Sequence, residues 1–594
     1  MEANAVSLAF LANENIIKIP FFQRAYVWVE DNWAELLTDL LDFNKKQFFG
    51  SLILKQVQTP AGEVTQRLVI DGQQRLTTLS ILLRALYNSF DEGRKKHADS
   101  RLKQLLFYED QGLYTEGVFI IKIEHSKVDK ENYSKVIEDG IDPLTIDAKK
   151  EPSKILQCYR YFTDALSEID YDKRLKLFNK LCNKDNHILV VINLDANDNE
   201  QAIFDTINSA GVRLSGADIV KNAIFQKAIE LGNQKNVEAL YNDYWGDIFS
   251  GDEDAIAYWE AKRQTGRLVR DNIELLLHSI AVIEGFFDPE KHTLSDIPNL
   301  YKDHIKDFKF EELKKFIKDI AKYAQLYNKK MLTLDDNQFS FTNFEARLFH
   351  ILKVCDISTF HPYILSLYLK YENDPERIKT ELAKLETFIL RRAVAESSET
   401  KNYNRLCKDF INDSSKIDEL LPEVTDESVK RGLAKINNKM AALLLFWVEL
   451  HRRANEAQFK DITELKYEYS LEHIMPQQWI HCWNDIPVID EDGNEISEIN
   501  EPERRKSYRY GLIYSIGNMT LLKRALNTSL RNYEFKRKIE GEGKNNCIRK
   551  HSELTITRDI IDAYDRGDTV WDERKIRERT SKLADEILSI WKAV

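Results

Sequence analysis

Glu472-His473-Ile474-Met475-Pro476 has the clearest structural and chemical content in this chain, and Gly517-Asn518-Met519-Thr520-Leu521-Leu522 and Asn527 follow it downstream. Residues 466–474 alternate like a strand that ends within the first of these motifs. The Glu472 carboxylate and an amide such as that of Asn527 can hold a hard cation, Mg²⁺ or Mn²⁺, through oxygen. His473 can take a proton from water near neutral pH, and Asn518 would brace the loop that carries it. The pattern predicts a one-metal site for phosphodiester cleavage.

Length and composition indicate a multidomain globular protein. The chain has 594 residues, 43% of them hydrophobic, and a prior of roughly 150 residues per domain suggests three or four domains. The net charge of -12 excludes a uniformly basic nucleic-acid coat, so contact with nucleic acid must use a local patch. The six cysteines include no Cys-x-x-Cys pair, which argues for a reducing compartment and against a cysteine-based zinc site. No signal peptide opens the sequence, and the longest apolar run, residues 440–448, is too short to span a bilayer, so we expect a soluble cytoplasmic protein.

Hydrophobic periodicity divides the chain into three regions of an α+β protein. Residues 1–230 mix strands and helices, residues 231–455 are almost wholly helical, and residues 456–594 mix both again. In the first region we expect a helix capped by Asp31, strands over 16–19 and 187–194, a hairpin of 48–57 with 66–70 closed over 59–62, and helices over 76–90, 201–208 and 215–231. Elsewhere we expect helices over 272–283, 311–326, 374–394, 427–451, 532–539 and 572–591. We expect an all-helical middle domain, interpreted as a spacer, while a role in target recognition stays open.

The C-terminal region holds a local excess of positive charge. Residues 501–550 contain 13 Lys or Arg and five Glu, which gives +8 inside an acidic chain. A solvated helix face explains many such charge runs, but the overlap with the motifs above favours contact with phosphate. The candidate DNA contacts are Lys523, Arg524, Lys536 and Lys538.

A second motif, Asp71-Gly72-Gln73-Gln74-Arg75-Leu76-Thr77-Thr78, is predicted to run from a strand through a turn into a helix. Gly72 lets backbone approach a ligand closely, and the helix N-terminus and Arg75 both suit phosphate oxygens, with Thr77 as a hydroxyl donor. The alternative is a plain Asp-Gly turn with a helix cap. That alternative explains Asp71 and Gly72 but not two glutamines followed by an arginine, and both interpretations stay open.

Further polar clusters precede and follow this motif. Gln23 and Arg24 lie among aromatic residues that are more typical of a core, and Phe49-Gly50-Ser51 forms another cluster. Residues 204–214, with Asp218 and Lys221, form a fourth. Charged and amide side chains need polar partners inside a core, which makes these clusters candidate binding residues.

Together these motifs resemble a known family. The N-terminal third resembles the GmrS-type domain, which is related to the ParB/sulfiredoxin-like fold, in Ile19-Pro20, Gln23-Arg24, Phe49-Gly50-Ser51, residues 71–75 and residues 204–214. The C-terminal quarter resembles the GmrD-type domain, an HNH or His-Me finger nuclease with a ββα-metal fold, in residues 472–476, residues 517–522 and Asn527, with Phe535 and Lys538 behind. Both modules in this order resemble the fused GmrSD type IV restriction enzymes of bacterial phage defence, a subset of which senses phosphorothioate-modified DNA.

The resemblance implies three domains: a nucleotide-binding and DNA-sensing domain over 1–230, a helical spacer over 231–455 and an endonuclease over 456–594. The first would bind and hydrolyse a nucleoside triphosphate through Gln23, Arg24, Asp71, Gly72, Gln73, Gln74, Arg75 and Thr77. The last would cut DNA with His473, Asn518 and Asn527 as catalytic residues and Glu472 and Asn527 on the metal. Glu472 replaces the aspartate of many HNH nucleases and Asn527 replaces their last histidine, and neither change predicts an inactive site.

The expected function is an NTP-dependent or NTP-regulated DNA endonuclease that restricts phage or foreign DNA according to its modification state, in the cytoplasm of a bacterium or archaeon. Homo-oligomerisation stays open. Two alternatives remain: a non-catalytic nucleotide-gated DNA-binding switch, and an RNA-directed nuclease toxin. The intact set of Glu472, His473, Asn518 and Asn527 argues against the switch.

Overall fold

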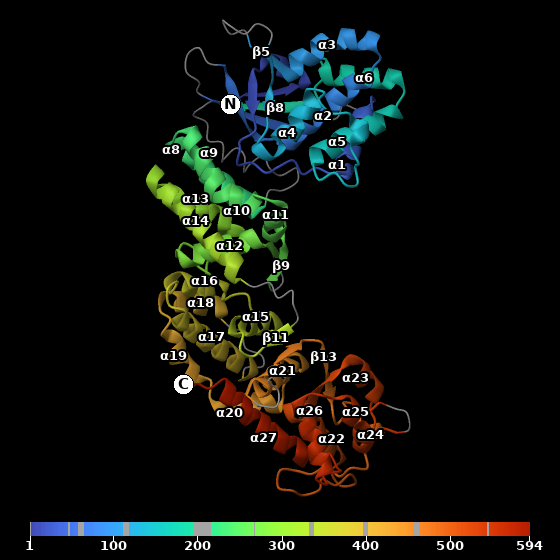
Figure 1. The fold of residues 1–594 in the computed structure, drawn as a ribbon, viewed down its shortest axis with the longest axis vertical. Coiled ribbons are helices and arrows are strands. Elements are labelled where there is room, and N and C mark those ends of the chain that lie inside the picture. The colour runs from blue at the N-terminus through green and yellow to red at the C-terminus, as the bar shows by residue number, and fades with distance from the viewer. Residues whose placement is uncertain are drawn as a thin grey trace. The chain divides into compact units, whose positions relative to one another are not determined.

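The computed structural model describes residues 2–44, 48–57, 64–110, 118–194, 215–265, 268–331, 338–395, 402–455, 463–542 and 546–593 (Figure 1). The chain forms two compact units, Met1–Tyr241 and Asn242–Val594. The predicted domain boundaries after residues 230 and 455 stay predictions. Across the described ranges, no helix has both the length and the apolar character needed to cross a membrane.

The first unit is built on a six-stranded mixed sheet with the order β1-β8-β3-β4-β2-β7. Its strands are β1 (Glu2–Val6), β2 (Ile16–Lys18), β3 (Ser51–Gln56), β4 (Gln66–Asp71), β7 (Ile123–Glu124) and β8 (Leu189–Leu194). β3 pairs antiparallel with β4 and parallel with β8, while β2 runs parallel to both β4 and β7. The predicted pairing of the two hairpin strands is confirmed, whereas their turn over 59–62 and the helix expected over 201–208 lie outside the described residues. A separate two-stranded ribbon joins β5 (Phe107–Asp110) to β6 (Val118–Ile121).

Helix α2 (Gln73–Asn88) starts directly after β4 and forms the centre of this unit's core. Its leucines Leu79, Leu82, Leu83 and Leu86 are fully buried, because α2 contacts α3 (Glu92–Leu106), α4 (Lys127–Ile137), α5 (Lys154–Ser167) and α6 (Tyr171–Cys182) (Figure 1). The other helices among the described residues of this unit are η1 (Leu8–Asn13), α1 (Glu30–Leu41), η2 (Pro143–Thr145), α8 (Gly216–Leu231) and α9 (Gln234–Tyr241). α1 begins at Glu30 after the cap residue Val29, so the prediction that Asp31 caps it is wrong.

The second unit opens with a helical array. Its elements are η3 (Asn242–Gly246), α10 (Asp247–Ser250), α11 (Glu253–Glu260), α12 (Asn272–Ile283), η4 (Leu294–Asp296), α13 (Ile297–Ile305), α14 (Phe310–Lys330), α15 (Phe344–Val354), α16 (His361–Lys370), α17 (Pro375–Ala395), α18 (Tyr403–Asn412), α19 (Lys416–Leu420), η5 (Leu421–Glu423), α20 (Asp426–Ala434) and α21 (Asn438–Asn455).

The prediction of an all-helical middle is wrong at two places. A hairpin of β9 (Lys262–Thr265) with β10 (Leu268–Asp271) and a strand β11 (Gln338–Ser340) interrupt the helices, and strands this short carry too few residues to show alternation. The prediction of a single helix over 427–451 is also wrong, because two helices, α20 and α21, occupy this range. The Asn437 side chain accepts a hydrogen bond from Met440 N at 2.9 Å and caps a new helix there.

The C-terminal part of this unit is tied to the helical array, because β11 pairs with β12 (Glu464–Lys466). The strand expected over 466–474 corresponds to β13 (Tyr469–His473), and β12 is a separate short strand that ends at Lys466. The elements that follow are η7 (Trp479–His481), α22 (Pro502–Ile513), η8 (Ile516–Asn518), β14 (Met519–Lys523), α23 (Arg524–Leu530), α24 (Phe535–Glu540), α25 (Ile548–His551), α26 (Thr555–Asp565) and α27 (Glu573–Ile590). They enclose a core that includes Ile474, Met475, Trp479 and Trp483, so the chain directly after His473 is anchored by burial.

Candidate functional site

An antiparallel hairpin followed by a helix carries the C-terminal motif. In the pair of β13 with β14, Glu472 lies opposite Thr520 and His473 lies opposite Met519. Helix α23 follows β14 without a break and contacts both strands. This order of strand, strand and helix brings the three separated motif segments into one local structure.

Asn518 sits at the centre of this structure and is completely buried. Its amide nitrogen donates to Met475 O at 2.9 Å and to Ile513 O at 3.0 Å. Its amide oxygen accepts from Met475 N at 2.9 Å and from Trp571 Nε1 at 3.2 Å. Because all these bonds hold backbone or core groups, Asn518 braces the segment after His473 and has no direct chemical part in this geometry.

Lys538 reaches the motif from α24. Its ammonium donates to Glu472 Oε1 at 2.6 Å and to the carbonyl oxygens of His473 and Ile474 at 2.9 Å each. The Lys538 side chain is 0% exposed, so it is not placed to contact DNA, and this predicted contact is corrected. Burial raises the pKa of the Glu472 carboxyl, while the charge of Lys538 opposes that rise. Lys538 therefore holds the end of β13 and orients its carboxylate.

His473 is positioned to act as a neutral imidazole. Burial, with the nearby charge of Lys538, lowers the pKa of His473 to about 4, so the ring is unprotonated near neutral pH and can accept a proton. Its Nε2 is buried and has no hydrogen-bond partner within the described part of the chain. The Tyr514 ring packs edge-on against the imidazole, with 5.9 Å between ring centroids.

Asn527 lies on α23 beside β13. Its amide nitrogen donates to Ser470 Oγ and to Leu471 O, both at 2.9 Å, which leaves the amide oxygen as the atom for a cation. Lys538 engages Glu472 Oε1, so Oε2 is the carboxylate oxygen that would meet the same ion. In the described ranges, no group of three or more His, Cys, Asp or Glu side chains is arranged to hold a metal. The donor set fits an oxygen-seeking ion that keeps much of its water, such as Mg²⁺, and does not fit structural zinc.

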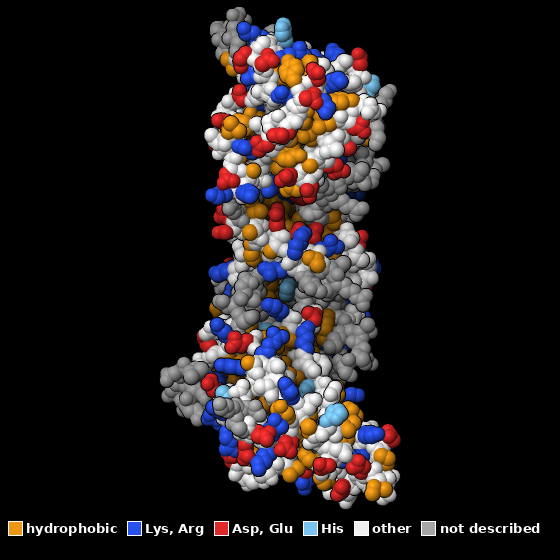
Figure 2. All heavy atoms as spheres, turned by 90° about the vertical axis from the view of Figure 1, so that its right-hand side faces the viewer, with side chains coloured by type: hydrophobic (Ala, Val, Ile, Leu, Met, Phe, Trp, Pro, Cys, Tyr) orange, Lys and Arg blue, Asp and Glu red, His pale blue; other side chains and the backbone are white. Residues whose placement is uncertain are grey.

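The basic residues of this region have different surroundings. Lys523, Arg524 and Lys536 are exposed and remain candidate DNA contacts. Arg509 is fully buried and donates to Glu573 Oε1 at 2.6 Å, so part of the local charge is structural. Acidic and basic side chains are interspersed over the face in Figure 2, which fits a contact limited to a small patch.

The N-terminal motif forms a tight turn between β4 and α2. Gly72 has a φ of 91°, and a Cβ there would lie 2.8 Å from Ser51 O. Gly50 has a φ of 100°, and a Cβ there would lie 2.7 Å from Arg75 Nε. Arg75 donates to Ser51 O at 3.1 Å and lies 3.9 Å from Asp71 Oδ2. Both glycines are therefore needed for backbone and guanidinium to approach so closely.

The glutamines of this region hold one loop. Gln23 Nε2 donates to Val69 O at 2.6 Å, and Gln73 Nε2 donates to Arg24 O at 2.9 Å. Gln74 donates to Ala25 O at 3.1 Å and accepts from Val27 N at 2.9 Å. These bonds fix residues 23–27 against β4 and α2. They give a structural role to the glutamines of the motif, which a plain Asp-Gly turn did not explain.

Three of the predicted nucleotide contacts are buried, and Gly72 is one of them. Gln74 is 7% exposed and is used by the loop, while Thr77 is 1% exposed and its hydroxyl bonds His125 Nε2 at 3.1 Å. Gln23, Arg24, Asp71, Gln73 and Arg75 stay partly exposed around the turn.

The surroundings of the turn add further charged groups. Burial raises the pKa of Asp71, opposed by Arg75 and Arg24. Asp218 and Lys221 of α8 form an ion pair at 2.9 Å, while the predicted cluster over 204–214 lies outside the described residues. Arg24, which lies in the loop of residues 23–27, therefore belongs to the same polar site as Asp71.

Several supporting residues escaped the sequence analysis. Asp129 Oδ2 accepts from Tyr26 N at 2.7 Å, and Tyr26 OH contacts Thr78 Oγ1 at 2.6 Å and Trp33 Nε1 at 2.8 Å. Tyr514 and the buried role of Lys538 were missed in the same way. Tyr26 and Lys538 belong to the sequence motifs, but the sequence does not show these contacts, because the partners are distant along the chain.

Comparison with known proteins gives two family matches. The model for the N-terminal domain of the GmrSD restriction endonuclease matches residues 8–225, and the model for the C-terminal domain matches residues 415–586. An uncharacterized protein of Methanocaldococcus jannaschii is 24% identical over 278 residues. That alignment covers 42% of this chain and 46% of the relative, so the chain spans under half of the length of this curated relative.

Proposed function

The chain belongs to the GmrSD restriction endonuclease family, and from that premise we propose that it is a metal-dependent DNA endonuclease of the HNH type, regulated by a nucleoside triphosphate, that restricts phage or foreign DNA according to its modification state. One observation carries the proposal. The β13–β14 hairpin and α23 bring Glu472, His473 and Asn527 together, with Asn518 and Lys538 fixing the backbone between them.

The cleavage step follows from the state of His473. Its neutral imidazole takes a proton from a water molecule, and the resulting hydroxide attacks phosphorus in line with the leaving oxygen. Glu472 and Asn527 would hold Mg²⁺ or Mn²⁺, which supplies stabilisation of the negative charge on the leaving oxygen. Lys538 orients Glu472, and Asn518 keeps the backbone after His473 in place. Lys523, Arg524 and Lys536 contact the phosphates of the flanking DNA.

The N-terminal turn is the proposed nucleotide site. The first turn of α2, Arg75 and Arg24 present positive groups to phosphate, and Gly72 lets the turn pack closely against Ser51. The nucleotide site lies in the first unit, and the cleavage site lies in the second. Nucleotide hydrolysis would accordingly be coupled to DNA recognition.

A nicking assay tests the function directly. Supercoiled plasmid, modified and unmodified, and a matched RNA are incubated with the purified chain, with and without nucleoside triphosphate. The proposal requires cutting of DNA that depends on modification and changes with nucleotide. Binding without cutting would establish the gated switch instead, and cutting of RNA alone would establish the toxin.

The nuclease is expected to lose activity when divalent cations are removed. A carboxylate and an amide bind hard cations weakly enough for exhaustive EDTA treatment to strip the ion, and Mg²⁺ or Mn²⁺ should restore cutting. Plasmid nicking is the measurement, and DNA binding in EDTA by gel shift is the control for folding. Full activity in EDTA, or rescue by zinc alone, would contradict the assignment.

Arg75→Ala and Asp71→Ala are expected to reduce nucleotide turnover about 10- to 100-fold, since a charge-assisted contact contributes about 1.5–3 kcal/mol. Phosphate release and phage plating are measured on the same variants. Lys173→Ala removes a largely exposed lysine of the same unit and serves as the matched control. Unchanged turnover in both test variants would make the turn a structural feature only.

A further inference from the structure

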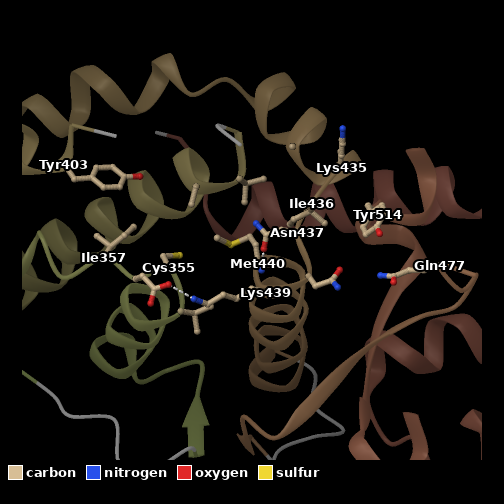
Figure 3. Close-up of a pocket in the computed structure, with 16 residues that line it drawn as sticks. Cys355, Ile357, Tyr403, Lys435, Ile436, Asn437, Lys439, Met440, Gln477 and Tyr514 are labelled. Atoms are coloured by element: carbon tan, nitrogen blue, oxygen red, sulfur yellow. Dashed lines mark hydrogen bonds and ion pairs between the residues drawn. The ribbon is translucent and has the colours of Figure 1, made fainter. Parts of the chain in front are cut away.

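A cavity of about 1000 Å³ lies inside the second unit (Figure 3). Its walls come from the end of α15 and the residues after it, from α17, from the segment between α20 and α21, and from Gln477 and Tyr514. The helical array and the C-terminal motif region therefore contribute to one site. A DNA duplex is too large to enter this cavity. The volume lies within the usual range for pockets that bind small ligands, such as a nucleotide.

The cavity and the candidate catalytic residues share one framework. Tyr514 lines the cavity and packs against His473, with 5.9 Å between ring centroids. Tyr514 O accepts from Ile436 N at 2.9 Å, and Asn518 holds the neighbouring Ile513 O at 3.0 Å. Tyr514 is therefore a wall of the cavity and a direct neighbour of the His473 imidazole at the same time.

The lining suits a nucleobase. Tyr514, which is 37% exposed, lies across the cavity from Tyr403 (Figure 3). An exposed aromatic ring can stack on a base without regard to sequence. Asn438 and Gln477 supply amide groups that can pair with base edges. Two lysines and one aspartate give the lining a net charge of +1, which suits a neutral base with a phosphate at the mouth.

We propose that this cavity receives one unstacked nucleobase of the DNA strand that His473 cuts, next to the scissile phosphate. The inference rests on the proposed endonuclease function, because only DNA held at His473 brings a base to this cavity. Enzymes that examine a base individually take it out of the stack into such a pocket. The helical array is then part of the substrate site and not only a spacer.

Photocrosslinking tests the proposal with the full chain. The His473→Ala variant is bound to duplexes that carry 4-thiothymidine at successive positions around the cut found with the wild-type chain, irradiated and mapped by mass spectrometry. We expect adducts in the peptides that contain Tyr403, Gln477 or Tyr514, at one or two adjacent positions only. Adducts exclusively in other peptides would overturn the inference while the proposed function stands. Absence of cutting by the wild-type chain would overturn both.

Two further arms make the test specific. Asn438→Ala combined with Gln477→Ala should lower the yield of these adducts about tenfold, whereas Asn500→Ala, an exposed amide elsewhere in the unit, should not. An 8-azido nucleoside triphosphate is irradiated in parallel without DNA. If this free nucleotide labels the cavity peptides and the duplexes do not, the base belongs to the regulatory nucleotide and the proposal is wrong.

Discussion

His473→Ala is expected to reduce DNA cleavage on the order of 10²- to 10⁴-fold, the usual effect of losing a general base. The reason is specific to this imidazole: its Nε2 has no protein partner in the described chain, and its pKa of about 4 keeps the ring unprotonated. The same absence of a partner means that truncation breaks no internal hydrogen bond at Nε2. Folding and DNA binding should therefore persist, and nicking assays with gel shifts on the same preparation measure both.

The matched control is His481→Ala, which removes an exposed histidine of the same region. It should cut DNA like the wild-type chain. Near wild-type nicking by His473→Ala, in a preparation cleared of host nuclease, would contradict the assignment of His473 as the general base. Loss of DNA binding together with cutting would instead identify His473 as a structural residue.

Lys538→Met is expected to destabilise the second unit by about 3–5 kcal/mol and to weaken divalent-cation binding. Met fills similar space, but Glu472 keeps a buried carboxylate without its cation, and the carbonyl oxygens of His473 and Ile474 lose their donor. Chemical denaturation measures the first effect, and Mn²⁺ titration by calorimetry measures the second without reference to catalysis.

Lys536→Met is the control for Lys538→Met, because Lys536 is an exposed neighbour on the same helix. Combining Lys538→Met with Glu472→Gln should recover part of the lost stability, since it removes the uncompensated charge. A Lys538→Met chain as stable as Lys536→Met would show that the buried pair does not hold β13. An additive double variant would show that the two side chains do not act as a pair.

Local patterns were sufficient for much of the secondary structure. The helix expected over 272–283 coincides with α12, and the pairing of residues 48–57 with 66–70 corresponds to β3 and β4. Such elements depend on hydrophobic periodicity within one segment, so the residues of that segment are enough to predict them. The division of 427–451 into α20 and α21 was not visible, because a cap at Asn437 and a bond from Ile436 to Tyr514 decide it.

By itself the sequence determined the order of chemical groups in the C-terminal motif and the turn at Asp71-Gly72, since both depend on residues that are close in the chain. Which polar residues are buried, and against which partners, depends on the packing of distant segments. The sequence predicts a DNA contact for Lys538, yet this side chain is enclosed with Glu472, which lies 66 residues away in the chain. Gln74 looked like a ligand contact, yet it closes a loop 49 residues earlier. Burying a charged or amide group requires a partner, and a pairing between distant segments leaves no periodic signal in either one.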